Sequence, residues 1–219
     1  MNWRLVWNLF EVCSAMGVMI KAFGEGGRGI NQALATRETW EILRETTEQQ
    51  VWARGVWFSM ATPKFAFIVS LAMQNRLSNM DRISKWSHGV DTICVLCKNE
   101  VETLDHLFFK CEFSGQLWRY LVRGLLGNSY SEVWSELVQK ISGGAFYKRI
   151  LFCLRYAFHA AIYAIWRERN KVKHGEKLMP MAVLAKLTEK GVRNKLSIIR
   201  GKGGKGMENV LQYWFQSRV

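Results

Sequence analysis

Aspartate is scarce in this sequence. Asp81, Asp91 and Asp105 are the only three among 219 residues, and no two of them are neighbours. Nucleases and polymerases that use two metal ions hold them between closely placed carboxylates. The sequence offers no such pair, so we expect a protein that is not an enzyme and that has no small-molecule substrate.

A convincing secretory signal is also missing, and so is a long uninterrupted apolar run. The apolar stretch 5–20 contains Asn8 and Glu11, unlike the core of a signal peptide. The stretch 150–166 is shorter than the ~20 residues of a membrane span and contains Arg155. A membrane helix is the alternative, but we expect a buried helix whose Arg155 extends its charged end to solvent, and no membrane partner.

The sequence has five cysteines, too few for a dense disulfide framework. Cys13 and Cys153 stand among apolar residues, without the neighbouring base that activates a nucleophile, so we expect them to be packing residues. Together with the missing secretory signal, this predicts an intracellular protein of the nucleus or cytoplasm.

The other three cysteines form a metal-binding pattern with one histidine. Cys94 and Cys97 are separated by two residues, and His106 and Cys111 by four. Three thiolates and one imidazole complete a tetrahedral shell with no open position, which is typical of a structural site. We therefore expect one structural Zn²⁺. Two alternatives stay open: a set of buried thiols, and His88 as the fourth ligand in place of His106.

The ligand spacing is similar to a retroviral-type zinc knuckle with a longer middle segment, and the resemblance extends beyond the ligands. The matching segments are 56–58, 63–65, 75–77, 81–83, 102–109, 113–114 and Trp118. In this order they resemble the reverse-transcriptase zinc-binding domain of plant LINE-type retrotransposons, and 166–170 is similar to the segment that often follows it. The resemblance covers roughly residues 40 to 175. It implies a module derived from a retrotransposon polyprotein, without the polymerase and the endonuclease.

Acidic residues are rare at the C-terminal end. Residues 148–219 contain sixteen basic and four acidic side chains, net +12, whereas residues 1–147 have a net charge of +1. Such asymmetry favours a polyanionic partner, and we expect RNA or DNA bound with low sequence specificity. The predicted nucleic-acid-binding residues are Lys171, Lys173, Lys177, Lys186, Lys190, Arg193, Lys195, Arg200, Lys202 and Lys205.

Other roles for these features stay open. The basic residues can equally be the solvated face of a packing helix. Trp86 and Phe108 are the aromatic residues that could stack on bases, although both types are common in cores. The zinc loop can instead serve a protein–protein interaction module that has no nucleic-acid role, and a retrotransposon fragment without a selected function is a third possibility.

The fold is predicted to be mainly α. Apolar periodicity and capping residues predict a small helical domain built around the zinc loop, with a long apolar helix over 150–166 and a basic C-terminal helix. Further helices are expected over 63–77, as a buried core helix, and over 114–126 and 131–142, and the aromatic segment 210–215 is expected to dock on the core. The predicted domains are an N-terminal segment of uncertain structure (1–39), the zinc-binding domain (40–126), a helical extension (127–175) and a basic C-terminal region (176–219).

Overall fold

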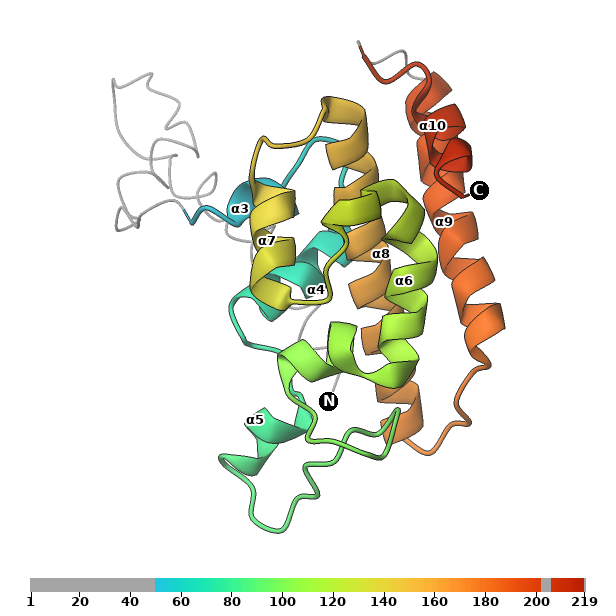
Figure 1. The fold of residues 1–219 in the computed structure, drawn as a ribbon. Helices are drawn as coiled ribbons and strands as arrows, with labels where there is room; N and C mark the ends of the chain where they lie inside the picture. Colours follow the sequence, from blue (N-terminus) through green and yellow to red (C-terminus); the bar gives the residue numbers. More distant parts are fainter. Residues whose placement is uncertain (1–49, 202–205, 219) are drawn as a thin grey trace, which may run out of the picture. The chain divides into compact units, whose positions relative to one another are not determined.

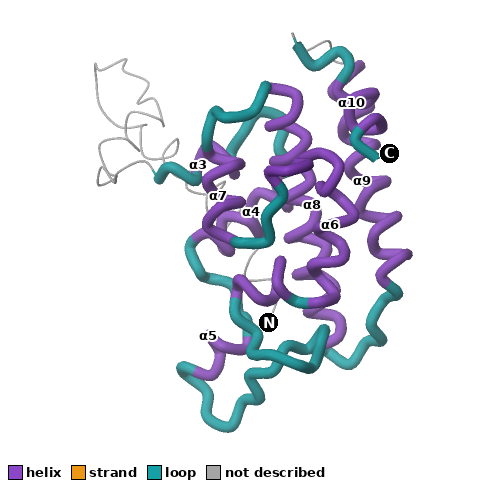
Figure 2. Tube along the Cα trace, in the orientation of Figure 1, coloured by secondary structure: helices purple, strands orange, loops and turns teal. Residues whose placement is uncertain are grey.

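The computed structural model describes residues 50–201 and 206–218, and these are almost entirely helices and loops (Figures 1 and 2). The helices are α3 (Ala53–Val56), α4 (Pro63–Met73), α5 (Met80–Ser84), the π-helical turn η1 (His106–Lys110), α6 (Glu112–Leu126), the 3-10 turn η2 (Gly127–Ser129), α7 (Trp134–Ser142), α8 (Lys148–Lys173), α9 (Met181–Gly201) and α10 (Val210–Gln216). Within the described ranges, β structure is limited to a single bridge between Ile93 and Val101. The mainly α-helical prediction is confirmed.

Helix α8 is the long apolar helix and forms the centre of the bundle. It packs against α4, α6, α7 and α9 (Figure 1). Phe158, in the middle of α8, is fully buried, and its ring lies 5.6 Å from that of Phe109 and 5.8 Å from that of Trp134. No helix in the described part of the chain is long and apolar enough to cross a membrane. The apolar run at 150–166 therefore serves the protein core.

Arg155, which was expected to extend its charged end to solvent, is partly accessible and is also bound at one nitrogen. Its Nε atom donates a hydrogen bond to the main-chain oxygen of Ile141 at 2.7 Å, and its guanidinium carbon lies 5.7 Å from the centre of the Phe58 ring. The side chain is half-buried. A carbonyl oxygen at the end of α7 satisfies the donor, so this arginine ties α7 to α8.

The prediction of a buried core helix over 63–77 is wrong in two respects. Helix α4 ends at Met73, and Asn75 adopts a positive φ of 50°. Only one face of α4 is buried, through Ala66, Val69, Ser70 and Ala72, while Phe67 is 44% exposed. The other apolar residues of α4 are only partly buried against the core, because the central position is taken by α8.

Helices α9 and α10 cover the side of the bundle formed by α6 and α8. After Pro180, α9 runs back along α8, and Lys195 lies with its Nζ atom 5.8 Å from the centre of the Tyr156 ring. The hydroxyl of Tyr120 on α6 donates to Glu189 of α9 at 2.6 Å. In α10, Val210 and Trp214 are fully buried. The aromatic C-terminal segment therefore docks on the core, as predicted.

The residues from Gln50 onward group into one compact unit. The predicted N-terminal segment 1–39 and Cys13 lie outside the described residues. The predicted boundaries after residues 126 and 175 stay predictions. They separate segments by their family resemblance and charge, which the packing of the helices does not test.

Candidate metal centre

Cys94 and Cys97 lie in a tight turn at the tip of a small hairpin. The hairpin is closed by the main-chain N–H of Cys94, which donates to the oxygen of Glu100 at 2.7 Å, and by that of Glu102, which donates to Thr92 at 2.8 Å. Within the turn, the N–H of Lys98 donates to the oxygen of Cys94 at 2.9 Å. The turn brings the two thiols, two residues apart, to the same side of the backbone.

His106 and Cys111 are brought together by the π-helical turn η1. The N–H of Cys111 donates to the oxygen of His106, five residues earlier, at 2.7 Å. In a regular α-helix two residues five apart point about 140° away from each other. The wider π turn reduces this separation, so the four-residue spacing between the histidine and the cysteine fits one metal site. Such turns occur frequently at functional sites.

The four side chains converge. Their ligand atoms all lie within 4.8 Å of one another. The Cys94 and Cys111 sulfurs are 4.0 Å apart, and the Cys97 sulfur is 3.3 Å from Nε2 of His106. A tetrahedral zinc ion with ordinary bond lengths separates two sulfurs by about 3.8 Å and a sulfur and a nitrogen by about 3.5 Å. The donor set and its dimensions therefore fit Zn²⁺.

The orientation of His106 leaves Nε2 as the metal-facing nitrogen. Its other nitrogen, Nδ1, lies 3.1 Å from Oε2 of Glu100, although the angle is not that of a hydrogen bond. Glu100 is largely exposed on the hairpin arm. A carboxylate beside the distal nitrogen is the usual outer partner of a zinc-bound histidine, where it fixes the tautomer.

The two fully buried thiols of the metal cluster share a hydrogen bond. Cys94 donates to Cys111, and this bond raises the pKa of Cys94 and lowers the pKa of Cys111. Burial also raises the pKa of Cys94. Without metal, Cys94 therefore keeps its proton at neutral pH, and a metal ion must displace that proton to bind both sulfurs as thiolates.

The other candidate ligands are not part of this cluster. His88 is exposed, and within the described ranges the only group suited to a metal is the one formed by Cys94, Cys97, His106 and Cys111. Cys153 is buried in α8, where burial raises its pKa to about 12. Its surroundings agree with the packing role expected of it.

The basic residues predicted to bind nucleic acid do not form a single cluster. Lys171 and Lys173 lie at the end of α8, Lys177 follows in the connection to α9, and the rest that are described are distributed along α9, which is about 30 Å long. Lys171 pairs with Glu176 at 3.4 Å. Lys195 lies over Tyr156, on the packed side of α9. Lys202 and Lys205 lie outside the described residues.

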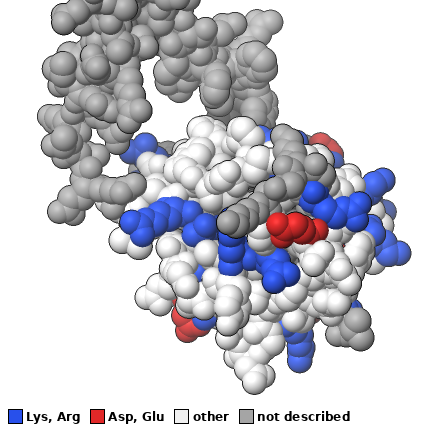
Figure 3. All heavy atoms as spheres, turned by 90° about the horizontal axis from the view of Figure 1, so that it is seen from above, with Lys and Arg blue, Asp and Glu red and all other residues white. Residues whose placement is uncertain are grey.

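Four of the predicted residues share one edge of α9. At 100° per residue, Lys186, Lys190, Arg193 and Arg200 fall within an arc of about 80°. Three of them are exposed and Arg193 is half-buried. We call these four residues the basic edge of α9. The end of the bundle seen in Figure 3 also shows more basic than acidic side chains.

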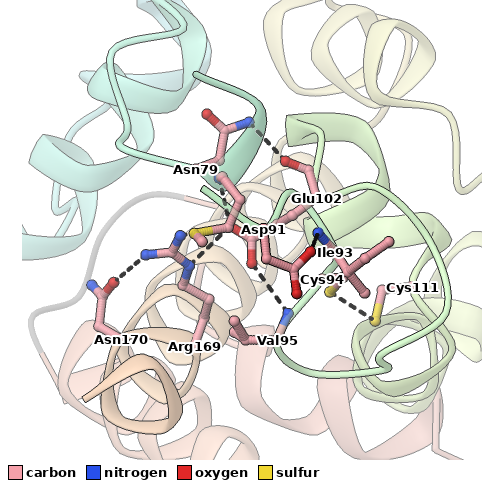
Figure 4. A network of polar contacts seen from close by, with 10 residues as sticks. Asn79, Asp91, Ile93, Cys94, Val95, Glu102, Cys111, Arg169 and Asn170 are labelled. Atoms are coloured by element: carbon pink, nitrogen blue, oxygen red, sulfur yellow. Dashed lines mark hydrogen bonds and ion pairs between the residues drawn. The ribbon is translucent and has the colours of Figure 1, made fainter. Parts of the chain in front are cut away.

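Sequence reasoning missed a buried ion pair next to the zinc turn. Glu102 of the hairpin and Arg169 of α8 are 0% and 1% exposed, and Nη2 of the arginine lies 2.6 Å from Oε1 of the glutamate (Figure 4). One clue was present in the sequence: both residues belong to segments that resemble the zinc-binding domain and the segment that follows it. Nothing in the sequence showed that the two segments meet.

The comparisons agree with the geometry. Residues 35–118 match a family described as zinc-binding in reverse transcriptase. No curated protein and no solved structure matches the chain. The matched stretch contains all four residues of the metal cluster and overlaps the predicted domain 40–126. Over residues 35–118 the chain is therefore similar to the zinc-binding domains of reverse transcriptases.

Proposed function

We propose that the chain is a nucleic-acid-binding module of a LINE-type retrotransposon polyprotein, separated from the polymerase and the endonuclease. One structural Zn²⁺, held by Cys94, Cys97, His106 and Cys111, keeps the loop between α5 and α6 folded. The protein has no catalytic role, in keeping with a family of zinc-binding and not catalytic domains. RNA or DNA binds through its phosphates, so sequence selectivity is low.

The observation that carries the nucleic-acid role is the basic edge of α9. Its four side chains span about 21 Å along one edge of the helix. The acidic residue of the same stretch, Glu189, lies about 20° outside their arc and accepts a hydrogen bond from Tyr120. A row of this kind can follow a phosphate backbone, and each phosphate that it neutralises releases counterions. The matching zinc-binding family is described by its place in reverse transcriptases, whose partners are nucleic acids.

The metal assignment is tested by replacing ligands. Cobalt bound to the wild-type chain should give the absorption of a tetrahedral, thiolate-rich site, and Cys97→Ser or Cys111→Ser should lose it. Cys153→Ser is the matched control, because this cysteine is buried but outside the cluster. Full zinc occupancy in Cys111→Ser would exclude the proposed ligand set.

The nucleic-acid assignment is tested by charge replacement. Shortening the chain before α8 is unsuitable, because it would remove the centre of the core. Lys186, Lys190 and Arg200 are exposed and can be changed together to Gln. Losing three phosphate contacts should reduce the slope of log affinity against log salt for a single-stranded oligonucleotide by about 2.

The matched control changes Arg54, Lys64 and Arg76 to Gln. These residues are also exposed and remove the same charge, but they lie before the zinc turn. If both triple variants lose affinity equally, binding responds only to net charge and the basic edge is not the site. If the wild-type chain does not bind RNA or DNA at low salt, the nucleic-acid role itself is wrong.

A protein–protein interaction is the second candidate function. Beside the basic edge, α9 exposes Val183, Leu187 and Ile198, which are 46%, 49% and 53% accessible. Exposed apolar side chains mark a contact surface when they form one patch, and these three share one side of α9. The absence of nucleic-acid binding at low salt would favour this candidate.

A further inference from the structure

The strongest unexplained feature of the structure is the buried charge of Glu102. Its side chain is fully buried, and burying a carboxylate is costly unless it is paired and hydrogen-bonded. In the sequence it lies between the two halves of the metal cluster. Cys94 and Cys97 precede it on the hairpin, and His106 and Cys111 follow it at the start and just after the end of η1. A charge at this position affects both halves.

The donors around this carboxylate come from three separate parts of the chain. Oε1 accepts hydrogen bonds from the N–H of Met80 at 2.9 Å and from Nε and Nη2 of Arg169 at 3.0 and 2.6 Å (Figure 4). Oε2 lies 3.5 Å from the N–H of Val95, which is inside the zinc turn between Cys94 and Cys97. The carboxylate therefore joins the start of α5, the zinc turn and α8.

The main chain of Glu102 is also hydrogen-bonded to other parts of the chain. Its oxygen accepts from the side-chain Nδ2 of Asn79 at 3.2 Å, and its N–H closes the hairpin on Thr92. Four residues later the chain enters η1, where the N–H of His106 donates to the hydroxyl of Thr103 at 3.1 Å. A displacement of Glu102 would therefore move both ligand pairs.

Arg169 is itself fixed in place. Its Nη1 atom donates to the side-chain oxygen of Asn170 at 2.9 Å, and its guanidinium carbon lies 5.0 Å from the centre of the Trp166 ring. Because α8 is the central helix, this arginine is held on the element against which α4, α6, α7 and α9 pack. It is suited to hold the zinc hairpin against the core.

We propose that Arg169, through Glu102, is a positioning residue of the metal site and sets its zinc affinity from outside the ligand shell. This proposal rests on the ligand set given above. Outer partners that hold first ligands in place typically change metal affinity by about 10- to 100-fold when they are lost. Arg169 acts across a separation of 67 residues from Glu102, so it couples the zinc loop to the segment 166–170.

The test compares two arginines of the same helix. Arg169→Met removes the partner of Glu102 and should weaken zinc binding about 10- to 100-fold, measured by competition with a chromophoric chelator. Arg155→Met is the matched control. Arg155 is also on α8 and also donates a hydrogen bond. It is only half-buried, and its partner is at the end of α7, away from the metal cluster. Circular dichroism and thermal unfolding give the stability of each variant.

Two further variants keep the proposal testable if Arg169→Met unfolds. Arg169→Lys keeps the charge but not the forked pair of donors, and should weaken zinc binding less. In the double variant Glu102→Gln, Arg169→Met, neither charge remains buried and unpaired, so the loss of zinc affinity should be smaller than the summed losses of the single variants. Strict additivity would show that the two residues do not act through each other.

Coupling must also operate in the reverse direction. Removing zinc from the wild-type chain should speed amide hydrogen exchange at 166–173, and this response should be smaller in the double variant. If Arg169→Met and Arg155→Met have the same zinc affinity, within about twofold, at equal stability, the positioning role is overturned. If the wild-type chain binds no zinc, the ligand assignment itself fails instead.

Discussion

His159, in the middle of α8, donates a hydrogen bond from Nε2 to the main-chain oxygen of Gly55, 3.1 Å away and 104 positions earlier in the chain. The histidine is fully buried, and its Nδ1 atom has no hydrogen-bond partner. Burial lowers the pKa of His159 to about 4, and the nearby charge of Arg155 acts in the same direction. The folded protein therefore holds this residue neutral, as a fixed link between α3 and α8.

This arrangement predicts a loss of stability in mild acid. Below its unfolded pKa of about 6.5 the histidine binds a proton in the unfolded chain but not in the folded one. The free energy of unfolding should therefore fall between pH 6.5 and pH 4, by up to about 3 kcal/mol from this residue. His159→Gln keeps an N–H donor but cannot titrate, so urea unfolding at pH 7 and pH 4.5 should show a smaller fall in the variant. Zinc release in acid affects both proteins and cancels in the comparison. An equal fall in both would show that His159 is not responsible.

Phe158 should be among the costliest side chains to remove. It is fully buried, and its ring contacts those of Phe109, Trp118 and Trp134 from three other elements. Phe158→Ala should lower the free energy of unfolding by about 3–5 kcal/mol, because a cavity remains in a packed core. Phe67→Ala removes the same atoms from a ring that is 44% exposed and should have a much smaller effect in the same denaturant titration. Similar losses would contradict the position of Phe158 at the centre.

Zinc affinity should rise with pH. Cys94 keeps its proton in the metal-free site because it donates to Cys111, and zinc must displace that proton. Each displaced proton makes the affinity change about tenfold per pH unit. Calorimetry in two buffers of different ionisation enthalpy should detect proton release on zinc binding at pH 7. Cys153→Ser should release as many protons as the wild type, since Cys153 lies outside the cluster. Zinc uptake without proton release would contradict the pairing of Cys94 and Cys111.

Trp86 should contribute to nucleic-acid binding, whereas Phe108 should not. Trp86 is 61% exposed, and the guanidinium of Arg82 lies 5.3 Å from the centre of its ring. Phe108 is fully buried and presents no face to a base. Stacking of one base on Trp86 would be worth about 1–3 kcal/mol, which Trp86→Ala should lose in an anisotropy titration with a single-stranded oligonucleotide. Trp57→Ala is the control, because Trp57 is 57% exposed but, within the described part of the chain, no Lys or Arg lies over its ring. Equal effects of the two changes would remove Trp86 as a specific platform.

Much of the fold was predictable because local chemistry decides it. Pro63 starts α4 after Thr62, as its fixed φ and missing N–H predict, and Gly127 ends α6 with a positive φ. The start of α6 was predicted at Ser114, but the helix begins at Glu112. Its N-cap is Cys111, which is held by η1. No capping side chain marks that start, so the sequence could not locate it.

The metal residues could be identified from spacing alone, and their convergence agrees with that identification. The residues that hold these ligands in place could not be identified from the sequence. Glu102 and Arg169 are both charged, and charged residues are ordinarily placed on the surface. Only the complete fold shows that α8 carries Arg169 to the hairpin. In the same way, helical spacing cannot distinguish a central helix from a covering one, which is why α4 was assigned to the core.

The π turn between His106 and Cys111 has a consequence for how this sequence can change in length. Its backbone accommodates one more residue than an α-helical turn does, and the N–H of Cys111 reaches His106 only with that extra residue present. In an ordinary α-helical turn, two residues four apart point within about 40° of each other. The π turn gives a similar convergence to two residues that are five apart. If this segment returned to regular α-helix at its present length, the cysteine would point about 140° away from the histidine. The length of the segment and the width of its turn are therefore linked, whereas the intervening side chains can vary in chemistry as far as the core allows.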